Sequence, residues 1–498
     1  MKISQVVQVL ESAGLGPTLT CLPGNDPDIR DVCTHTGQVA PGSLYCCVKG
    51  FKSDGHAYAG EAEARQAAAL FAEHPIETAL PLVLVKDVRK AAALAAAAVH
   101  GFPASKLRLA AVTGTNGKST TAWITRSILR HGGIACGLLG TIVYDDGKAE
   151  EPGARTTPDG PSIQRWLSRM VANEGQACVM EASSHGLDLE RLEGCRFDAL
   201  AFTNLTPEHL DFHGDMEGYF RAKLRLFTDH ARPGARFALN IDDPWGRRLA
   251  ELFPENSIPY GVAGKAPVRA RILAMGLEGT NLNLVLPGRE HPLRVQSPLV
   301  GLHNVSNLLA AAALSVTLGV QADAIREGIE GMPPVPGRLQ RFGFENGVSC
   351  FIDYAHTPDG LEKALKAVGE NCRGSVHAVF GLGGERTIEN RPLMGHVAAE
   401  HADTVVLTMD NPRSENPLAI AMQIEEGLEG ARLRSHSVIL DRREAVHAAL
   451  DSALPGDVVL VAGKGPETTM ILAQGPVPYN DEESVREWGN SRGIPIVP

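Results

Sequence analysis

Short apolar runs alternate with longer amphipathic segments through most of the chain, and this alternation constrains the fold more than any other feature. LRLAAV (107–112), ACVMEAS (177–183) and DALAFTN (198–204) each precede a stretch with helical periodicity. Strands that recur between helical crossovers pair in parallel and are covered by helices on both faces. The pattern returns in DTVVLTM (403–409) and DVVLVAG (457–463). We therefore predict two open, doubly wound α/β sheets, one central and one C-terminal.

Two candidate domain boundaries divide the chain. At 498 residues it is long for one core, and about 150 residues per domain suggests three domains. The first boundary follows HGFPASK near residue 103, and the second is GMPPVPGR (331–338), whose prolines cannot extend a helix. We predict a smaller α/β domain at 1–104, a central domain at 105–333 and a C-terminal domain at 334–498.

Composition excludes several classes of function. The net charge of −11 argues against binding nucleic acid through a basic face. The most apolar segment, AAALAAAAV (91–99), is far shorter than the roughly 18 residues of a membrane span, and the amphipathic start of the chain is unlike a secretory signal. Nine cysteines without a CxxC pair indicate reduced thiols. We expect a cytoplasmic protein without nucleic-acid or membrane partners.

The segment AAVTGTNGKSTTAWITRSIL (110–129) predicts a nucleotide site. A strand runs into a glycine-rich turn and then a helix, and the backbone N–H groups of such a turn cradle phosphates. Lys118 would reach the terminal phosphates, and Ser119 or Thr120 would ligate magnesium. The strict Walker spacing is absent because Val112 stands where its first glycine belongs.

Three further residues are candidates with open alternatives. Glu181 ends a strand, where a carboxylate could face the phosphate loop, although an ordinary strand-end glutamate fits as well. Thr206 and Pro207 predict a helix start that sets His209 and His213 one turn apart. The pair lacks the glutamate that follows the first histidine in zinc proteases, which argues against a zinc site. Two interpretations remain: one of the histidines is a magnesium ligand, or it is buried and hydrogen-bonded.

By its position on a charged helix, Lys223 is predicted to be a solvated surface residue.

The order and spacing of several motifs resemble those of the Mur ligase family, over essentially the whole chain. Within it, the chain is most similar to members that add meso-diaminopimelate to UDP-N-acetylmuramoyl-L-alanyl-D-glutamate. The motifs are GTNGKST, EASSHGL, TNLTPEHLDFHGDMEGY, HNVSN, GRLQRF, DYAHTPDGL, NRPLMG, DNPRSENP and AGKGPE.

The resemblance implies a UDP-binding N-terminal domain, a central ATPase domain and a Rossmann-like C-terminal domain. ATP would phosphorylate the D-glutamate carboxylate, and the amine would then attack the acyl phosphate while the domains close to exclude water. Catalysis would rest on Lys118, Glu181, His209 and Lys223, with Lys223 carbamylated by CO2. Magnesium would be held by Ser119, Glu181, His209 and the Lys223 carbamate. ATP would be bound by Gly114, Thr115, Asn116, Gly117, Lys118, Ser119, Thr120, Asn304, Arg338 and Asp353.

The same resemblance implies residues for the other two substrates. UDP-muramoyl-dipeptide would contact Thr36, Thr156, Thr157, Ser183 and Arg191. Diaminopimelate would contact Arg391, Asp410, Asn411, Pro412, Arg413, Gly463 and Glu467. Asn304 could instead open its helix and Asp353 could cap a turn.

Arg413 has a specific chemical task in this scheme. Diaminopimelate differs from lysine by one distal carboxylate, which a planar guanidinium grips bidentately. A site that pairs this carboxylate would reject lysine by leaving the guanidinium unpaired.

The chain departs from the family pattern in two places. His35, Thr36 and Gly37 replace Asp-Ser-Arg at the uridine site, and Pro466 replaces the histidine of Lys-Gly-His-Glu. The loop at 49–56 keeps the family's form and is predicted to touch uracil.

Two other classes of protein share a phosphate loop of this kind. A regulatory GTPase would need Asn-Lys-x-Asp, which the sequence lacks. An ATP-driven switch module remains open from the loop alone, and within the family a lysine-adding or folylpolyglutamate-type ligase is the alternative. We expect a monomer.

Overall fold

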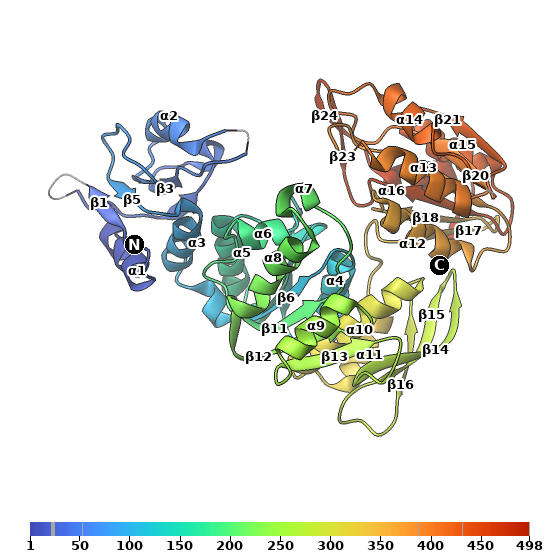
Figure 1. Cartoon of the computed structure of the whole chain (residues 1–498), viewed down its shortest axis with the longest axis horizontal. Helices are drawn as coiled ribbons and strands as arrows, with labels where there is room; N and C mark the ends of the chain where they lie inside the picture. The colour runs from blue at the N-terminus through green and yellow to red at the C-terminus, as the bar shows by residue number, and fades with distance from the viewer. Residues whose placement is uncertain (21–24, 52, 387, 431, 498) are drawn as a thin grey trace. The chain divides into compact units, whose positions relative to one another are not determined.

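The computed structural model describes every residue except 21–24, 52, 387, 431 and 498 (Figure 1). The chain forms two compact units, which comprise Met1–Val268 with Leu309–Gly328, and Arg269–Leu308 with Ile329–Pro498. The expected mixed α/β architecture is confirmed. The domain boundaries at 104 and 333 remain predictions.

The first unit begins with a five-stranded sheet in the order β1-β5-β4-β3-β2, in which β1 alone runs antiparallel. In its first helix the apolar residues Ile3, Val6, Val7 and Leu10 form one stripe that is buried against the sheet. Helices α1 and α3 cover one face, while η2 and α2 cover the other. The elements are α1 (Ile3–Ser12), β1 (Thr18–Thr20), β2 (Asp31–Cys33), η1 (Thr36–Gln38), β3 (Ser43–Cys46), η2 (Gly55–Tyr58), α2 (Ala59–Ala64), β4 (Ala69–Ala72), β5 (Leu82–Leu84), α3 (Val88–Val99) and η3 (Pro103–Lys106).

The predicted central parallel sheet is present in the same unit. Its parallel strands follow the order β13-β12-β11-β6-β10-β7, and β8 and β9 extend it antiparallel. The strands are β6 (Arg108–Thr113), β7 (Cys136–Leu139), β8 (Val143–Asp145), β9 (Glu150–Pro152), β10 (Ala177–Glu181), β11 (Phe197–Phe202), β12 (Ala231–Asn240) and β13 (Ser257–Gly261). The helices are α4 (Lys118–His131), α5 (Gly160–Ala172), α6 (Ser184–Asp188), α7 (Leu210–His213), α8 (Met216–Thr228) and α9 (Pro244–Leu252).

Alternation along β6 explains why this sheet is buried on both faces. Leu109 and Ala111 belong to a core shared with α5, α8 and α9, whereas Ala110 and Val112 are buried on the opposite side. Helix α4 packs against β6, β7 and β10. Because the strands are parallel, the carboxyl ends of β6 and β10 meet at one edge, which is where the predicted phosphate loop and Glu181 lie.

The second unit contains three antiparallel strands and the predicted C-terminal sheet. The sheet order is β21-β20-β19-β22-β18-β17-β25, with β18 to β22 pairing in parallel. Alternate residues of β22 face opposite cores, Leu460 towards α12, α13 and α14, and Val461 towards α15 and α16. The strands are β14 (Val268–Gly276), β15 (Gly279–Val285), β16 (Leu293–Ser297), β17 (Gln340–Phe344), β18 (Ser349–Asp353), β19 (Val376–Phe380), β20 (Thr404–Leu407), β21 (Ser435–Val438), β22 (Val458–Ala462), β23 (Thr469–Leu472), β24 (Gly475–Pro478) and β25 (Ile496–Val497).

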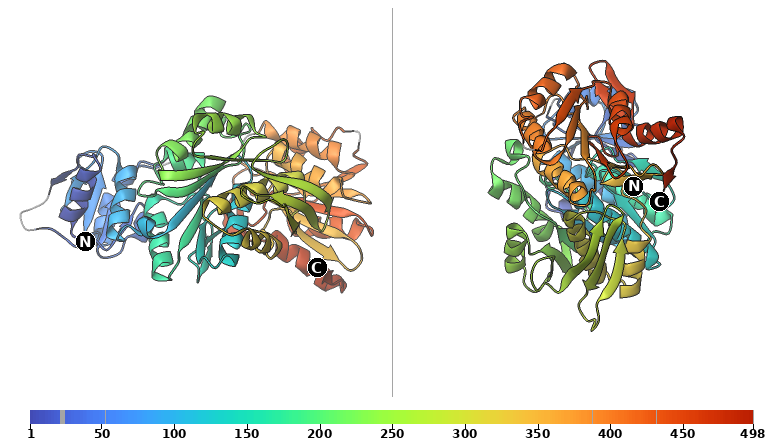
Figure 2. Two further views of the ribbon diagram at one scale, coloured as in Figure 1. Left: turned by 90° about the horizontal axis from the view of Figure 1, so that it is seen from below. Right: turned by 90° about the vertical axis from the view of Figure 1, so that its right-hand side faces the viewer.

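The helices of this unit are α12 (Pro358–Gly369), α13 (Asn390–His401), α14 (Pro417–Glu425), α15 (Arg442–Ser452) and α16 (Asp481–Arg492). Helices α10 (Leu302–Thr317) and α11 (Ala322–Glu330) have residues in both units. The sheets and the helices that cover them can be followed in the two views of Figure 2.

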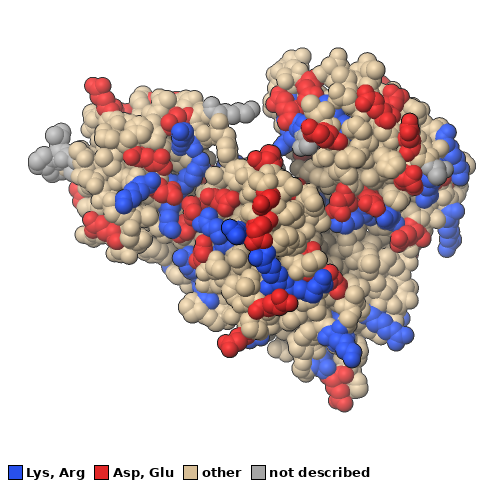
Figure 3. Space-filling model, in the orientation of Figure 1, with Lys and Arg blue, Asp and Glu red and all other residues tan. Residues whose placement is uncertain are grey.

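The surface charges and the hydropathy of the helices are two further features of the fold. Acidic and basic side chains are interspersed on the face in Figure 3. Within the described residues, no helix has both the length and the hydropathy to cross a membrane.

A fully buried ion pair joins α15 to α16. Arg442 Nε and Nη2 donate to the two carboxylate oxygens of Asp481 at 2.8 and 2.9 Å, and neither side chain is exposed to solvent. Arg442 also donates to the carbonyl of Ala462, the last residue of β22. Removing one partner of such a pair leaves an uncompensated buried charge.

We predict that Asp481→Ala lowers the free energy of unfolding by about 3–5 kcal/mol, because Arg442 loses its counter-charge. Urea unfolding followed by circular dichroism measures the change. Lys366→Ala is the control, since it removes a surface pair with Glu362 at 2.5 Å and should cost less than about 1 kcal/mol. Equal losses in the two variants would contradict the assignment.

Candidate active site

The phosphate loop lies between β6 and α4, as the sequence predicts. Gly114 has φ +146°, and a Cβ there would lie 1.9 Å from Thr203 Oγ1, so only glycine fits. Gly117 has φ +85° and caps α4. The loop therefore presents its backbone to the N-terminus of a 14-residue helix, the arrangement that binds phosphate groups.

Residues at the end of β11 hold the loop in this shape. The backbone N–H groups of Thr115 and Asn116 donate to the carbonyl and the side-chain oxygen of Asn204, both at 2.9 Å. Lys118 Nζ donates to the carbonyls of Gly114 at 2.9 Å and Thr115 at 2.8 Å. The ammonium of Lys118 thus lies across the loop that it is predicted to serve.

Glu181 faces the phosphate loop from the end of β10. Its side chain is buried and accepts hydrogen bonds from Ser119 Oγ at 2.9 Å and from the backbone N–H of Thr141 at 2.7 Å. A Cβ on Gly140 would lie 2.2 Å from Glu181 Oε1, so this glycine leaves room for the carboxylate.

This pair of oxygen donors fits magnesium. A hydroxyl and a carboxylate are the ligands that magnesium takes from proteins, usually one or two of them with water completing the shell. Among the described residues there is no cluster of three or more His, Cys, Asp or Glu side chains able to hold a metal.

The predicted helix start at Thr206 and Pro207 is wrong. Helix α7 begins only at Leu210, and His209 precedes it in a left-handed conformation with φ +55°. The reason is that Thr206 is tied to the phosphate loop, its N–H donating to Thr115 Oγ1 at 3.0 Å and its carbonyl accepting from the same hydroxyl. His209 and His213 nevertheless lie one turn apart, with His213 N–H donating to the His209 carbonyl at 3.0 Å.

The two histidines have different surroundings. The His213 side chain is 2% exposed, lies 3.2 Å from Asp188 and stacks on Tyr219. His209 is more exposed and contacts the ring of His185, with centroids 4.7 Å apart. Burial lowers the pKa of His209, so the imidazole is neutral near pH 7 and has a lone pair for a metal.

The prediction of a solvated Lys223 is wrong. Its side chain is 1% exposed, and Nζ donates to the carbonyl of Gly114 at 2.9 Å and lies 4.4 Å from the Tyr219 ring. Helix α8 turns this face towards the core, along with Phe220. Burial, with Lys118 nearby, holds the pKa of Lys223 well below its usual value, which favours the neutral amine, the form that can attack CO2.

Four residues predicted for the muramoyl substrate lie together beside Glu181. Thr157 Oγ1 donates to the Glu181 carbonyl at 2.8 Å and accepts from the backbone N–H of Ser183 at 2.9 Å. Arg191 Nη1 donates to the Thr157 carbonyl at 2.8 Å, and Thr156 Oγ1 accepts from Thr141. Burial, followed by the like charge of a neighbouring arginine, lowers the pKa of Arg191 to about 10.

Thr36, the remaining residue of that set, lies between β2 and β3 of the five-stranded sheet. It is buried in η1, where the His35 side chain accepts from the Gly37 N–H. The loop at 49–56 predicted to touch uracil includes Lys52, which lies outside the described residues.

Three residues predicted at the ATP site belong to the second unit. Asn304, in the first turn of α10, donates to the Val300 carbonyl at 2.8 Å. Asp353 accepts from the backbone N–H groups of Leu339 at 2.7 Å and Ala355 at 2.8 Å, so it also caps a turn. The Arg338 guanidinium lies 4.9 Å from the ring of Tyr354.

Arg413 has an unusual backbone and forms no ion pair among the described residues, although Glu415 lies close enough to interact with its charge. The φ of Arg413 is +53°, which is rare for a residue other than glycine. Its N–H donates to the Ile471 carbonyl at 3.0 Å, and Nη1 donates to the carbonyls of Gly384 at 2.5 Å and Asn411 at 3.3 Å. Neutral carbonyls orient this guanidinium without cancelling its charge.

Arg391 contrasts with Arg413. It is 1% exposed and pairs with Glu415 at 2.9 Å, with a further bond to Gln423. Its charge is therefore balanced within the protein. Glu415 N–H in turn donates to the Pro412 carbonyl at 3.0 Å, which connects Arg391 to the loop that carries Arg413.

The other residues predicted for diaminopimelate converge at the ends of β20 and β22. A Cβ on Gly463 would lie 2.6 Å from Asp410 Oδ2, and Asn411 Nδ2 donates to Glu467 Oε2 at 2.9 Å. Burial raises the pKa of Asp410. The structure thus brings together acidic groups suited to an ammonium and a guanidinium suited to a carboxylate.

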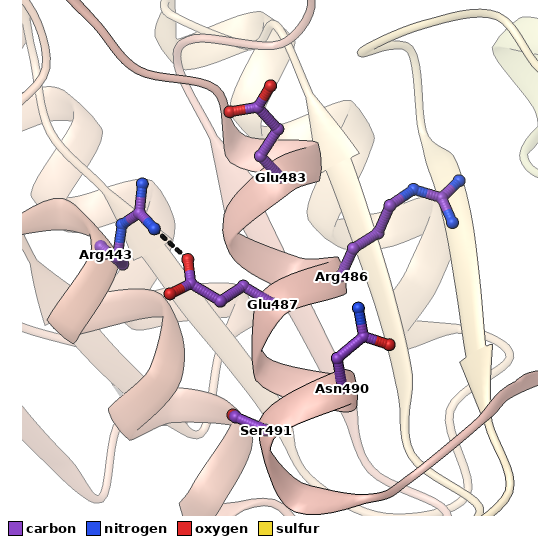
Figure 4. Close-up of a pocket in the computed structure, with 6 residues that line it drawn as sticks. All are labelled: Arg443, Glu483, Arg486, Glu487, Asn490 and Ser491. Atoms are coloured by element: carbon purple, nitrogen blue, oxygen red, sulfur yellow. Dashed lines mark hydrogen bonds and ion pairs between the residues drawn. The ribbon is translucent and has the colours of Figure 1, made fainter.

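A shallow depression on α16 involves different residues. It is lined by Arg443, Glu483, Arg486, Glu487, Asn490 and Ser491, as the close-up in Figure 4 shows. None of these is a predicted site residue, and an ion pair between Arg443 and Glu487 crosses it.

Comparison with known proteins decides the family. Residues 112–315 match the Mur ligase middle domain, and residues 337–465 match the Mur ligase glutamate ligase domain. The chain belongs to the Mur ligase family.

Relatives and a solved structure of similar length support this membership. A Geobacillus kaustophilus protein is 41% identical over 477 residues, with 94% of this chain and 96% of the relative covered. A Gloeobacter violaceus protein is 42% identical over 468 residues, with 93% and 94% covered. Both are described as UDP-N-acetylmuramoyl-L-alanyl-D-glutamate--2,6-diaminopimelate ligases, as is a solved structure with a TM-score of 0.65 and 29% identity that covers 93% of this chain and 95% of its own.

In this Mur ligase, three supporting residues were not predicted from the sequence. Asn204 binds the phosphate loop, Thr141 binds Glu181, and Lys464 contacts Glu467. Asn204 and Lys464 lie inside motifs of the family resemblance, which could have drawn attention to them. Thr141 had no such signal.

We predict that Gly114→Ala abolishes ATP binding by this Mur ligase, with affinity falling by about 100-fold or more, because Cβ and Thr203 Oγ1 cannot share the space. Isothermal titration with an ATP analogue measures it. Gly133→Ala is the matched control, since Gly133 also has positive φ but a Cβ there would meet no atom within 4 Å. It should cost about 1 kcal/mol of stability and leave ATP affinity intact.

Proposed function

We propose that this Mur ligase is an ATP-dependent amide ligase that adds meso-diaminopimelate to UDP-N-acetylmuramoyl-L-alanyl-D-glutamate in peptidoglycan precursor synthesis. The observation that carries the choice of amine is Arg413, whose guanidinium is oriented by backbone carbonyls and forms no ion pair among the described residues. Relatives of nearly the same length carry the corresponding name. Lysine addition and folylpolyglutamate synthesis are not favoured.

The first half of the reaction is assigned to the phosphate loop. A carboxylate is a poor electrophile, so an oxygen of the D-glutamate γ-carboxylate attacks the γ-phosphorus of ATP and ADP leaves. Lys118 and the N–H groups of the loop stabilise the charge on the phosphate oxygens. Thr156, Thr157, Ser183 and Arg191 would orient the muramoyl dipeptide beside them.

Magnesium would be held by Ser119 and Glu181, with His209 and carbamylated Lys223 contributing to a second ion, and it would supply charge neutralisation for the phosphates. Carbamylation joins the Lys223 nitrogen to the carbon of CO2 and releases one proton. It converts a cation that would repel the metal into an anion that orients it.

The second half of the reaction is assigned to the loop of residues 410–413, the DNPR loop, and its neighbours. Arg413 would pair with the distal carboxylate of diaminopimelate, while Asp410 and Glu467 suit its ammonium. The deprotonated amine then attacks the acyl carbon, the amide bond forms and phosphate leaves. We further propose that Arg391 acts through Glu415, and that the enzyme works as a cytoplasmic monomer.

We expect phosphate release to require ATP, magnesium, the muramoyl dipeptide and an amine, with diaminopimelate strongly preferred to lysine. A coupled phosphate-release assay measures both turnover rates. Because the preference depends on Arg413, Arg413→Lys should lower kcat/KM for diaminopimelate by about 10²- to 10³-fold, since an ammonium cannot bind a carboxylate bidentately.

Arg434→Lys is the control for that substitution, because Arg434 is 73% exposed and paired with Asp403 in the same unit. It should leave both rates unchanged. Equal turnover of lysine and diaminopimelate by the native enzyme would refute the proposed amine specificity.

We expect Lys223→Ala to reduce kcat by about 100-fold or more and acetate or formate to restore part of it, because a small carboxylate can take the place of the carbamate. Intact mass and bicarbonate dependence of the native enzyme provide independent readouts. Arg221→Ala, on the exposed side of α8, is the control, and acetate should not change its kcat. An unmodified Lys223 together with no rescue would rule out carbamylation.

A further inference from the structure

A second lysine of this Mur ligase is buried against the residues assigned to the amino acid. The Lys464 side chain has no solvent exposure, and its Nζ donates to Glu467 Oε2 at 2.8 Å and to Asn411 Oδ1 at 3.1 Å. Glu467 remains 32% exposed. Lys464 therefore approaches the predicted site from the protein interior, and Glu467 separates it from solvent.

The bonds to Glu467 are distributed unequally over its two oxygens. Oε2 accepts from both Lys464 and Asn411, at 2.8 and 2.9 Å. Oε1 accepts from the Tyr354 hydroxyl at the longer distance of 3.4 Å. Because Oε2 is occupied by strong donors, Oε1 is the oxygen with capacity to accept from a substrate ammonium.

Lys464 also joins two segments that are distant in sequence. Asn411 belongs to the DNPR loop after β20, whereas Lys464 and Glu467 belong to the turn after β22. Asn411 Oδ1 accepts from the Ile471 N–H at 2.9 Å in addition to Lys464. The ammonium thus fixes the orientation of the Asn411 amide, two residues from Arg413.

A buried ion pair is weak evidence for a role in stability, because the desolvation of two charges offsets much of their attraction. Two hydrogen-bonded partners that both lie in one proposed binding site favour a role in orienting them. An orienting role separates substrate affinity from overall folding, which makes it testable.

We propose that Lys464 is a positioning residue of the amino-acid site, which holds Glu467 by Oε2 and Asn411 by Oδ1 so that Glu467 Oε1 faces the substrate ammonium. This inference rests on the proposed function and extends it to a residue outside the predicted set. Lys464 does not touch the reacting atoms in this scheme. It acts through Glu467, while Arg413 selects the distal carboxylate.

The test is Lys464→Met, which keeps the length of the side chain and removes its charge. We expect KM for diaminopimelate to rise by about tenfold or more, while kcat and the KM values for ATP and the muramoyl dipeptide change by less than about threefold. The KM of Lys464→Arg for diaminopimelate should lie between those of Lys464→Met and the native enzyme. Lys363→Met, which breaks a surface pair with Asp359 at 2.7 Å, is the matched control.

A double-mutant cycle with Glu467→Gln tests the mechanism. Glu467→Gln should raise KM for diaminopimelate strongly in the native background and by about threefold or less in Lys464→Met, because the two residues act as one unit. Thermal unfolding with and without diaminopimelate gives an activity-independent readout, in which Lys464→Met reduces the ligand-induced shift. If Lys464→Met does not fold, Lys464→Gln takes its place.

Additive effects in the cycle, or an equal rise in all three KM values, would overturn the positioning role. A native enzyme that turns over lysine as fast as diaminopimelate would instead refute the proposed function, so the two failures are distinguishable.

Discussion

The buried carboxylate of Glu181 is the contact on which the rest of the first unit's site depends. Its side chain accepts from Ser119 on the phosphate loop and from Thr141 after β7, while its backbone carbonyl accepts from Thr157. Three segments that arrive from different strands are therefore set by one residue at the end of β10. A parallel sheet makes this possible, because it brings the carboxyl ends of neighbouring strands to the same edge.

The sheets and the phosphate loop could be predicted from sequence because their signals are local. A strand such as ACVMEAS (177–183) shows its burial in its own composition, and a glycine-rich turn between strand and helix has few alternatives. The placement of Glu181 followed from the same logic, since it requires only that β10 lie beside β6.

The errors concern residues whose environment is created by distant parts of the chain. The helix start expected at Thr206 fails because the Thr115 hydroxyl, 91 positions earlier, binds its backbone. Lys223 reads as a surface residue from its charged neighbours, yet it contacts Gly114, 109 positions earlier. Lys464 lies inside the AGKGPE motif, but nothing local in the sequence shows its contact with Asn411, which follows another strand. Long-range hydrogen bonds of this kind leave no local periodicity.

The hairpin of β23 and β24 has a consequence for how the DNPR loop can be changed. Ile471 on β23 exchanges hydrogen bonds with the DNPR loop, accepting from the Arg413 N–H and donating to Asn411 Oδ1. The left-handed backbone of Arg413 is thereby fixed by a strand that lies some sixty residues later. The loop and the hairpin form one hydrogen-bonded unit, so moving residues 410–413 alone into another chain would separate the arginine from the strand that shapes it.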